Sequence, residues 1–126
     1  MSMVDHSKPI AITLGDAAGI GPEIIVKAFR DEPEQMQGCV VVGDLAVMQR
    51  SALLLAQCEL HEPQMHVQLV SSLADVAHVV APMTIPVLQV TPPLVAGQLP
   101  AWGHISAAAG KLAADCVVWA AQAALR

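Results

Sequence analysis

IAITLGDAAGIGPEII occupies positions 10–25 of the chain and predicts the start of an α/β fold. Residues 10–14 form a short, largely β-branched run of the kind found in buried parallel strands. Three glycines follow within seven residues and allow backbone angles or close approaches that a Cβ atom would forbid. Gly21 can then serve as a helix N-cap, Pro22 suits the first helical position, and Glu23 places a carboxylate where the helix dipole favours it. The segment therefore predicts a strand, a tight turn and a helix.

This turn is expected at the carboxyl edge of a sheet, where open α/β folds bind ligands and where a helix N-terminus attracts anions. Its Gly15-x-x-x-Gly19-x-Gly21 spacing differs from both the dinucleotide fingerprint and the P-loop. A stand-alone phosphate-binding domain would need a basic residue near Gly19, and the sequence offers no such anchor. The residues alone therefore leave ligand binding and plain turn geometry as equal alternatives.

The rest of the chain alternates between helical and β patterns. Helices are expected at residues 22–30, at 44–57 with Asp44 as N-cap, and at 106–125, and strands at 39–42, 65–70 and 85–90. Residues 71–80 are ambiguous between a short helix and a loop. The alanine-rich last helix permits close packing and is expected to be buried between the sheet and a partner surface. Together these elements predict an α/β fold with a mostly parallel sheet and flanking helices.

Composition argues against nucleic acid and membrane as partners. The net charge is −5, the six basic residues are scattered, and aromatic residues make up only 2% of the chain, so no electrostatic footprint for nucleic acid is present. The long uncharged stretch at residues 76–99 is interrupted by four prolines and cannot form a continuous membrane helix. Residues 1–8 lack the pattern of a signal peptide. We therefore expect a cytoplasmic protein.

The cysteines and histidines do not form a recognisable metal site. Cys39, Cys58 and Cys116 are widely separated in apolar surroundings and are expected to be reduced core thiols. Four histidines lack ligand-pair spacing and are expected to be surface or hydrogen-bonded residues: His6, His61, His66 and His78. His104 is a candidate for substrate contact at the start of the last helix. Ser106 is a second candidate, although it can equally be the N-cap of that helix.

Two segments resemble a known enzyme family. Residues 13–23, TLGDAAGIGPE, resemble the opening signature T-x-G-D-P-A-G-I-G-P-E of the 4-hydroxythreonine-4-phosphate dehydrogenases, with Ala17 in place of the proline. Isocitrate and isopropylmalate dehydrogenases carry a shorter G-D-G-I-G-P-E, so the additional Ala17 and Ala18 favour the pyridoxine-pathway family. Residues 103–113, GHISAAAGKLA, are similar to the G-x-x-S-x-x-x-G-[KR] helix start of its 4-phospho-D-threonate/erythronate dehydrogenase branch. A weaker match is VVGD at residues 41–44.

The resemblance implies the N-terminal part of an isocitrate/isopropylmalate dehydrogenase-like fold. Family chains are more than twice as long, and their three metal-binding histidines and T-x-P-x-x-K segment have no counterpart here. Residues 1–126 are therefore expected to be the incomplete N-terminal portion of a larger two-domain dehydrogenase. The high hydrophobic fraction, 55%, agrees with a piece that leaves apolar surface uncovered.

The activity implied for the complete enzyme is NAD-dependent oxidation, with decarboxylation, of 4-phosphohydroxy-L-threonine or 4-phospho-D-threonate. A divalent metal (Zn, Mg or Co) and a homodimer are also implied, whereas the choice between NAD and NADP stays open. No catalytic residue and no metal ligand is expected in this chain, which should be inactive alone. The alternative is a non-catalytic truncated remnant or interaction module, and the coding sequence beyond Arg126 would distinguish the two.

By the same resemblance, four residues of the opening turn line the cofactor cleft: Gly15, Asp16, Gly19 and Gly21. For Asp16 we expect a mixed role in which hydrogen bonding within its own turn comes first. Lys27 is expected to be a solvated helix residue, although the resemblance places it near the cleft.

Overall fold

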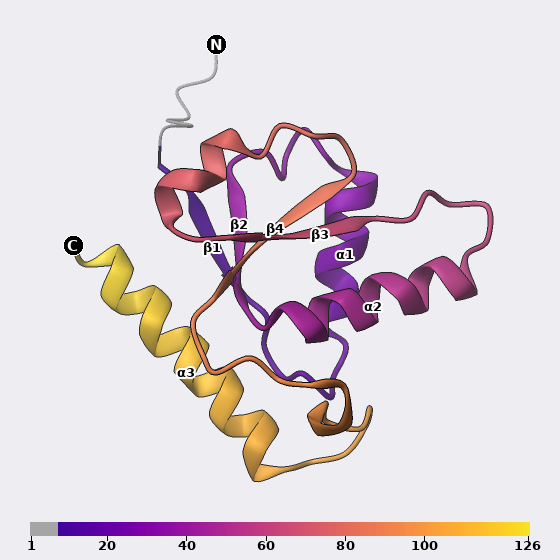
Figure 1. Cartoon of the computed structure of the whole chain (residues 1–126), viewed down its shortest axis with the longest axis vertical. Coiled ribbons are helices and arrows are strands. Elements are labelled where there is room, and N and C mark those ends of the chain that lie inside the picture. Colours follow the sequence, from indigo (N-terminus) through magenta and orange to yellow (C-terminus); the bar gives the residue numbers. More distant parts are fainter. Residues whose placement is uncertain (1–7) are drawn as a thin grey trace.

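The computed structural model describes residues 8–126 and has a four-stranded, all-parallel sheet flanked by helices (Figure 1). The strand order is β1-β2-β4-β3, with all three neighbouring pairs parallel. This confirms the predicted α/β class. In chain order the elements are β1 (Ile10–Thr13), α1 (Gly21–Asp31), β2 (Cys39–Gly43), α2 (Leu45–Cys58), β3 (His66–Val70), the 3-10 helix η1 (Leu73–His78), β4 (Thr84–Gln89), the 3-10 helix η2 (Ala96–Gln98) and α3 (Ala107–Ala124).

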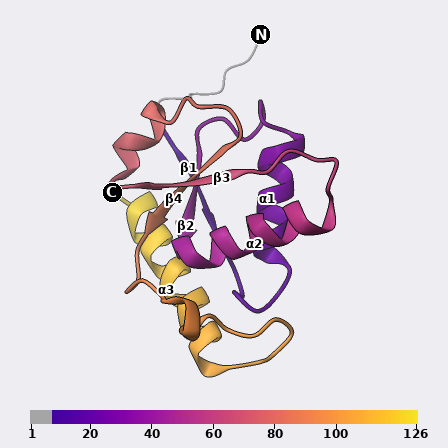
Figure 2. The ribbon, with the colours of Figure 1, turned by 45° about the vertical axis from the view of Figure 1, so that its right-hand side comes forward.

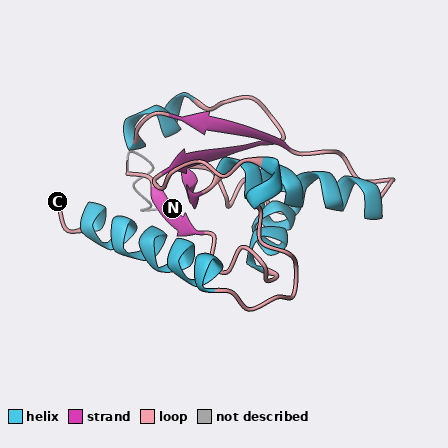
Figure 3. Cartoon of the chain, turned by 60° about the horizontal axis from the view of Figure 1, so that its bottom comes forward, coloured by secondary structure: helices cyan, strands magenta, loops and turns pink. Residues whose placement is uncertain are grey.

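The two central strands carry the core. Every residue of β2 is buried, as are the middle four residues of β4, in keeping with parallel strands covered on both faces. Helices α1 and α2 pack on each other, and α2 also contacts β3 and β4. Helix α3 runs along β1 and β2, apart from the α1–α2 pair (Figure 3). The carboxyl ends of the strands consequently point to one edge, from which the loops that follow β1, β2 and β4 leave the sheet.

The expected boundaries of the helices and strands agree with the structure to within one residue at every end, and two details differ. The N-cap of α1 is Ile20, not Gly21, because the helix already begins at Gly21. The ambiguous segment at residues 71–80 contains η1, a 3-10 helix with one buried residue, Val76. By contrast, Asp44 caps α2 as predicted, since its side chain accepts a hydrogen bond from the Val47 N–H at 3.0 Å.

One expectation about burial was wrong. Cys39 and Cys116 are buried thiols, but Cys58 is exposed because it lies at the C-terminal end of α2. Helix α3 packs on the sheet through Ala109, Leu112 and Cys116, and its outer side, which was expected to meet a partner surface, is exposed in the single chain. His61, His66 and His78 are exposed, as expected for surface histidines, and His6 lies outside the described residues. None of the described helices is long and apolar enough to cross a membrane.

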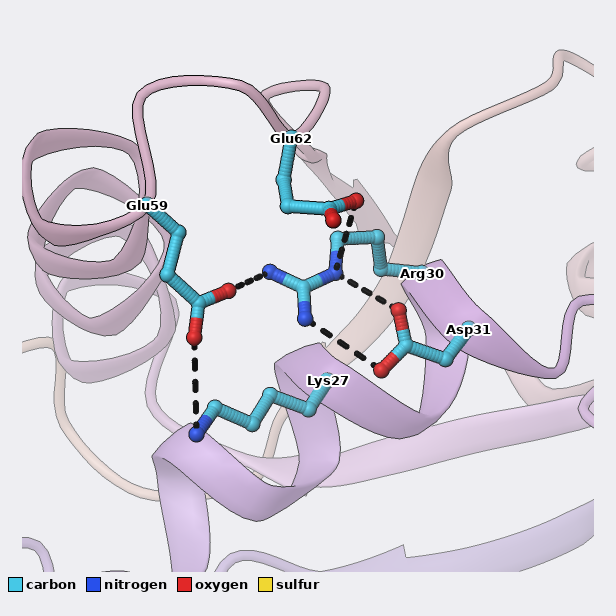
Figure 4. Close-up of polar contacts among 5 residues, drawn as sticks. All are labelled: Lys27, Arg30, Asp31, Glu59 and Glu62. Carbon is cyan, nitrogen blue, oxygen red and sulfur yellow. Dashed lines mark hydrogen bonds and ion pairs between the residues drawn. The ribbon is translucent and has the colours of Figure 1, made fainter.

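A charged cluster joins the ends of α1 and α2 (Figure 4). The Arg30 guanidinium binds Asp31, with Nε 2.8 Å from Oδ1, and Glu59, while Lys27 Nζ lies 3.7 Å from Glu59 Oε1. The hydrogen bonds between Arg30 and Asp31 are the main cause of both pKa shifts in the pair: they raise the pKa of Arg30 and lower the pKa of Asp31. Lys27 is exposed and belongs to this surface cluster, in agreement with the expected solvated helix residue.

Candidate functional site

The glycine-rich turn, residues 14–21, leaves β1 at the carboxyl edge of the sheet, as predicted. Each of its glycines has a different physical role. Gly15 has φ +72°, which L side chains rarely adopt. At Gly21 a Cβ atom would lie 2.7 Å from the carbonyl oxygen of Leu14, so the close approach of two backbone segments excludes a side chain. At Gly19 the nearest atoms to a Cβ would be 3.5 Å away, so neither crowding nor a positive φ requires glycine there.

Asp16 shapes the turn with both its side chain and its backbone. Its Oδ1 accepts a hydrogen bond from the Ala18 N–H at 2.8 Å, and its carbonyl oxygen accepts one from the Gly19 N–H at 2.9 Å. Hydrogen bonding within its own turn is the role that we expected to be the main one for Asp16. The residue is nonetheless exposed, so it also faces the space in front of the turn.

The first turn of α1 has no side-chain cap. Ile20 occupies the N-cap position and makes no side-chain hydrogen bond to the helix. The first N–H groups of a helix have no partners within the helix, and together with the helix dipole they favour negative charge. Pro22 removes one of these donors, and the carboxylate of Glu23 offsets part of the dipole in the first turn. The remaining partial positive charge next to Gly19 can accept an anionic group.

A buried carboxylate organises the same edge of the sheet. Asp44 follows β2 and is fully buried; its Oδ2 accepts hydrogen bonds from Gln89 Nε2 at 2.9 Å and from the Leu94 N–H at 3.0 Å. The Gln89 Oε1 atom in turn accepts a bond from the Leu45 N–H at 2.8 Å. This network joins the end of β2, the end of β4 and the beginning of the long connection to α3.

Arg50 is a basic residue beside the turn that the sequence did not reveal. It extends from α2, and its Nη2 donates to the Ala17 carbonyl at 3.0 Å while Nη1 donates to the Pro100 carbonyl at 2.6 Å. Its guanidinium carbon lies 4.3 Å from the centroid of the Trp102 ring, within the range of a cation–π contact. Burial lowers the pKa of Arg50 below its ordinary value. The prediction that no basic residue lies near Gly19 is therefore wrong, because folding brings Arg50 of α2 against the turn.

The two predicted site segments meet at this place. The Gly103 N–H donates to the Ala18 carbonyl at 2.7 Å, and the connection from β4 to α3 lies beside the turn after β1 in two views (Figures 1 and 2). His104 is exposed next to this contact. Ser106 Oγ accepts a hydrogen bond from the Ala109 N–H at 3.1 Å, which confirms its role as the N-cap of α3.

The described residues contain no group of three or more His, Cys, Asp or Glu residues that could hold a metal ion. Backbone N–H groups, the dipole of α1 and the charge of Arg50 together allow this edge to bind an anion or a polar ligand.

Comparison with known proteins links the chain to dehydrogenases, although no protein-family model matches it. The chain is 37% identical over 121 residues to a D-threonate 4-phosphate dehydrogenase of Salmonella typhimurium and 33% identical over 120 residues to a 4-hydroxythreonine-4-phosphate dehydrogenase of Beijerinckia indica. These alignments cover 96% and 95% of this chain but only 34% and 32% of the relatives. The chain thus spans about a third of the length of the curated relatives it matches.

The fold agrees with the sequence comparison. A solved structure of 4-hydroxythreonine-4-phosphate dehydrogenase from Klebsiella pneumoniae matches with a TM-score of 0.72 and 36% identity, over 94% of this chain and 34% of that chain. The resemblance first seen in two short segments therefore extends through the whole described sheet and its helices. Along nearly its full length, the chain is therefore similar in sequence and fold to the N-terminal third of 4-hydroxythreonine-4-phosphate and D-threonate 4-phosphate dehydrogenases.

Proposed function

We propose that the chain forms the glycine-rich side of the ligand cleft in an NAD-dependent dehydrogenase. The substrate would be a phosphorylated four-carbon hydroxy acid, either 4-phosphohydroxy-L-threonine or 4-phospho-D-threonate, whose oxidation is followed by decarboxylation. The observation that carries the proposal is the uncapped first turn of α1 beside Gly19, in a chain homologous over nearly its whole length to dehydrogenases with phosphorylated substrates in their names.

The chain's own residues have binding and positioning roles in this proposal. Gly19 allows the backbone to approach the cofactor, and the first turn of α1 and Arg50 provide positive potential for its phosphate groups. Gly15, Asp16 and Gly21 hold the turn in shape. The exposed His104 is the candidate for contact with the substrate. Bound NAD would supply the hydride acceptor for oxidation of the substrate alcohol. Ser106 serves chiefly as a helix cap, since its Oγ is already occupied by the Ala109 N–H.

The proposal extends to features that lie outside the described residues. The complete enzyme would be a two-domain homodimer in the cytoplasm, of which residues 1–126 form the N-terminal portion. It would use a divalent metal, Zn, Mg or Co. The described residues do not fit that metal, because they bring no three ligands together, so no step through it is assigned to this chain.

Backbone amide resonances of glycine provide a direct test of cofactor binding. Titration of the labelled chain with NAD⁺ is expected to shift the amide signals of Gly15, Gly19 and Gly103. The signal of Gly38, which precedes β2 at the opposite edge of the sheet, should stay in place and serves as an internal control. If NAD⁺ leaves the three site signals unchanged, or shifts all glycine signals alike, the cofactor assignment is wrong.

A variant separates ligand contact from turn geometry. Gly19→Val is expected to weaken NAD⁺ binding about tenfold or more while the fold persists, since position 19 has room for a Cβ and a negative or extended φ. A lower melting temperature with unchanged affinity would instead assign Gly19 to the turn alone. NADP⁺ titrated in parallel decides which dinucleotide is preferred.

An activity assay tests whether the catalytic residues lie in this chain. With NAD⁺, Mg²⁺ and either candidate substrate, the 126-residue chain is expected to show no dehydrogenase activity, because catalytic and metal-binding groups are assigned to other parts of the enzyme. Turnover of roughly one per second or more, the level of an ordinary enzyme, would place the catalytic residues in this chain and contradict that assignment.

A further inference from the structure

Arg50 joins two segments that are far apart in the sequence. One hydrogen bond is donated to the carbonyl oxygen of Ala17, in the glycine-rich turn, 33 positions before Arg50. The other is donated to the carbonyl oxygen of Pro100, in the connection to α3, 50 positions after it. The planar guanidinium presents its donors in a fixed fork, so one side chain can bond both oxygens and still lie over the Trp102 ring. Lysine has a single ammonium group and cannot reproduce this arrangement.

The electrostatic setting of Arg50 differs from that of Arg30. Arg30 pairs with Asp31 and Glu59, whereas no carboxylate of residues 8–126 lies within ion-pair distance of Arg50. Carbonyl dipoles and the Trp102 ring therefore stabilise a partly buried charge without neutralising it. Its Nε atom is buried without a hydrogen-bond partner among the described residues. A positive charge that is held in place and not cancelled strengthens the preference of the neighbouring α1 N-terminus for anions.

We propose that Arg50 is a positioning residue of the ligand site: it docks the segment at residues 100–104 onto the glycine-rich turn, so that Gly19 and His104 belong to one rigid binding surface for a phosphate-bearing ligand. The inference rests on the proposed function for the identity of the ligand. The docking itself rests on the contacts of Arg50 with Ala17, Pro100 and Trp102 and on the direct bond between Gly103 and Ala18.

Trp102 offers a reporter for docking. The chain has two tryptophans, and Trp119 packs against the core from α3. In a Trp119→Phe background, fluorescence therefore reports on Trp102 alone. Acrylamide quenching measures how exposed the ring is, and calorimetric titration with NAD⁺ measures ligand affinity. Circular dichroism and the melting temperature confirm that each variant is folded.

The experiment compares Arg50→Gln, Arg50→Lys and a matched control, Arg30→Gln, in this background. Arg50→Gln is expected to raise the quenching of Trp102 at least twofold and to weaken NAD⁺ binding about tenfold. Arg50→Lys should do nearly the same, because it keeps the charge but loses the fork and the stacked plane. Arg30→Gln should lower the melting temperature without changing Trp102 quenching or NAD⁺ affinity.

Each outcome decides for or against the proposal. Unchanged quenching in Arg50→Gln shows that the segment stays docked without the guanidinium and overturns the proposal. Full NAD⁺ affinity in Arg50→Lys despite an undocked Trp102 also overturns it, because Arg50 would then act through charge alone. If the parent chain does not bind NAD⁺, the proposed cofactor is wrong, and the quenching comparison by itself decides whether Arg50 docks the segment.

Discussion

The backbone of Gly21 packs so closely against the carbonyl of Leu14 that a Cβ atom at position 21 would lie 2.7 Å from the Leu14 oxygen. The chain enters the turn at Leu14 and leaves it at Gly21, so this contact closes the loop. Because the obstructing atom belongs to the backbone, no rotamer change can relieve the clash. The contact makes Gly21 a residue of the fold, whereas Gly19 has no comparable restriction.

We therefore predict that Gly21→Ala destabilises the chain by about 1–3 kcal/mol, as expected when one methyl group is forced into a packed site. Urea denaturation followed by circular dichroism measures the change in the free energy of unfolding. Gly19→Ala is the matched control, since its Cβ would meet only ordinary contacts at 3.5 Å, and it should lie within about 0.5 kcal/mol of the parent. Equal effects of the two substitutions would contradict the distinction between these glycines.

The Asp44 network gives a second prediction. Asp44→Ala removes a buried carboxylate that accepts three hydrogen bonds, from the Val47 N–H, Gln89 Nε2 and the Leu94 N–H, and should destabilise the chain by about 2–4 kcal/mol. Ser106→Ala removes only a helix cap from an exposed site and should lose about 1 kcal/mol. Thermal unfolding of both variants measures the difference. If Asp44→Ala loses no more than Ser106→Ala, Asp44 is a helix cap and nothing else.

Local patterns were sufficient for most of the fold. The β-branched run before the turn predicts β1, and the helical pattern after it predicts α1, with boundaries within one residue of the observed ones, because strand and helix periods depend on neighbouring residues. Asp44 was predicted to be a cap, and a cap was one of the two roles considered for Ser106, since each of these side chains bonds a backbone N–H three residues away. Features that depend on residues close together in the chain, such as helix boundaries and caps, could therefore be predicted from the sequence.

Contacts between distant segments could not be predicted in this way. Arg50 bonds two backbone carbonyls, and a carbonyl is present at every residue, so no side-chain pattern marks its partners. The difference between Gly19 and Gly21 likewise depends on where the Leu14 carbonyl lies after folding. Cys58 follows an apolar stretch, yet it is exposed because it lies at the end of α2.

Cys116 leads to a prediction about alkaline pH. Burial, with smaller contributions from Asp115 and Asp44, raises the pKa of this thiol from 9.0 to about 11. Between these values the unfolded chain loses the proton and the folded chain keeps it, so the free energy of unfolding falls as pH rises. The loss should be about 1 kcal/mol at pH 10 and at most about 3 kcal/mol above pH 11, and it should be absent below pH 8.

Denaturant unfolding at pH 8 and pH 10 measures this dependence. Cys116→Ala is expected to show a smaller loss between the two pH values than the parent chain, even though its stability at pH 8 is lower. Cys58→Ala, which changes an exposed thiol, should retain the full dependence. A Cys116→Ala variant with the same pH dependence as the parent would assign the effect to other groups.

The outer side of α3 gives the last prediction. Four residues spaced by three or four positions form an exposed apolar stripe: Ala114, Val118, Ala121 and Leu125. Val118 is 54% exposed and Leu125 is 88% exposed, and an uncovered stripe of this kind favours association. We expect the chain to self-associate at micromolar concentration, which light scattering detects as a mass above the 13.2 kDa of one chain.

Charge placed within the stripe should reverse this association. Val118→Glu is expected to restore the monomer with little change in melting temperature, because the side chain lies opposite the buried Leu112 and Cys116 on the helix. Gln122→Glu adds the same charge to the same helix at a position that is already polar and exposed, and it should leave the association intact. A parent chain that is monodisperse and monomeric at these concentrations would show that the stripe does not drive association, and equal effects of the two substitutions would attribute any change to net charge and not to the apolar surface.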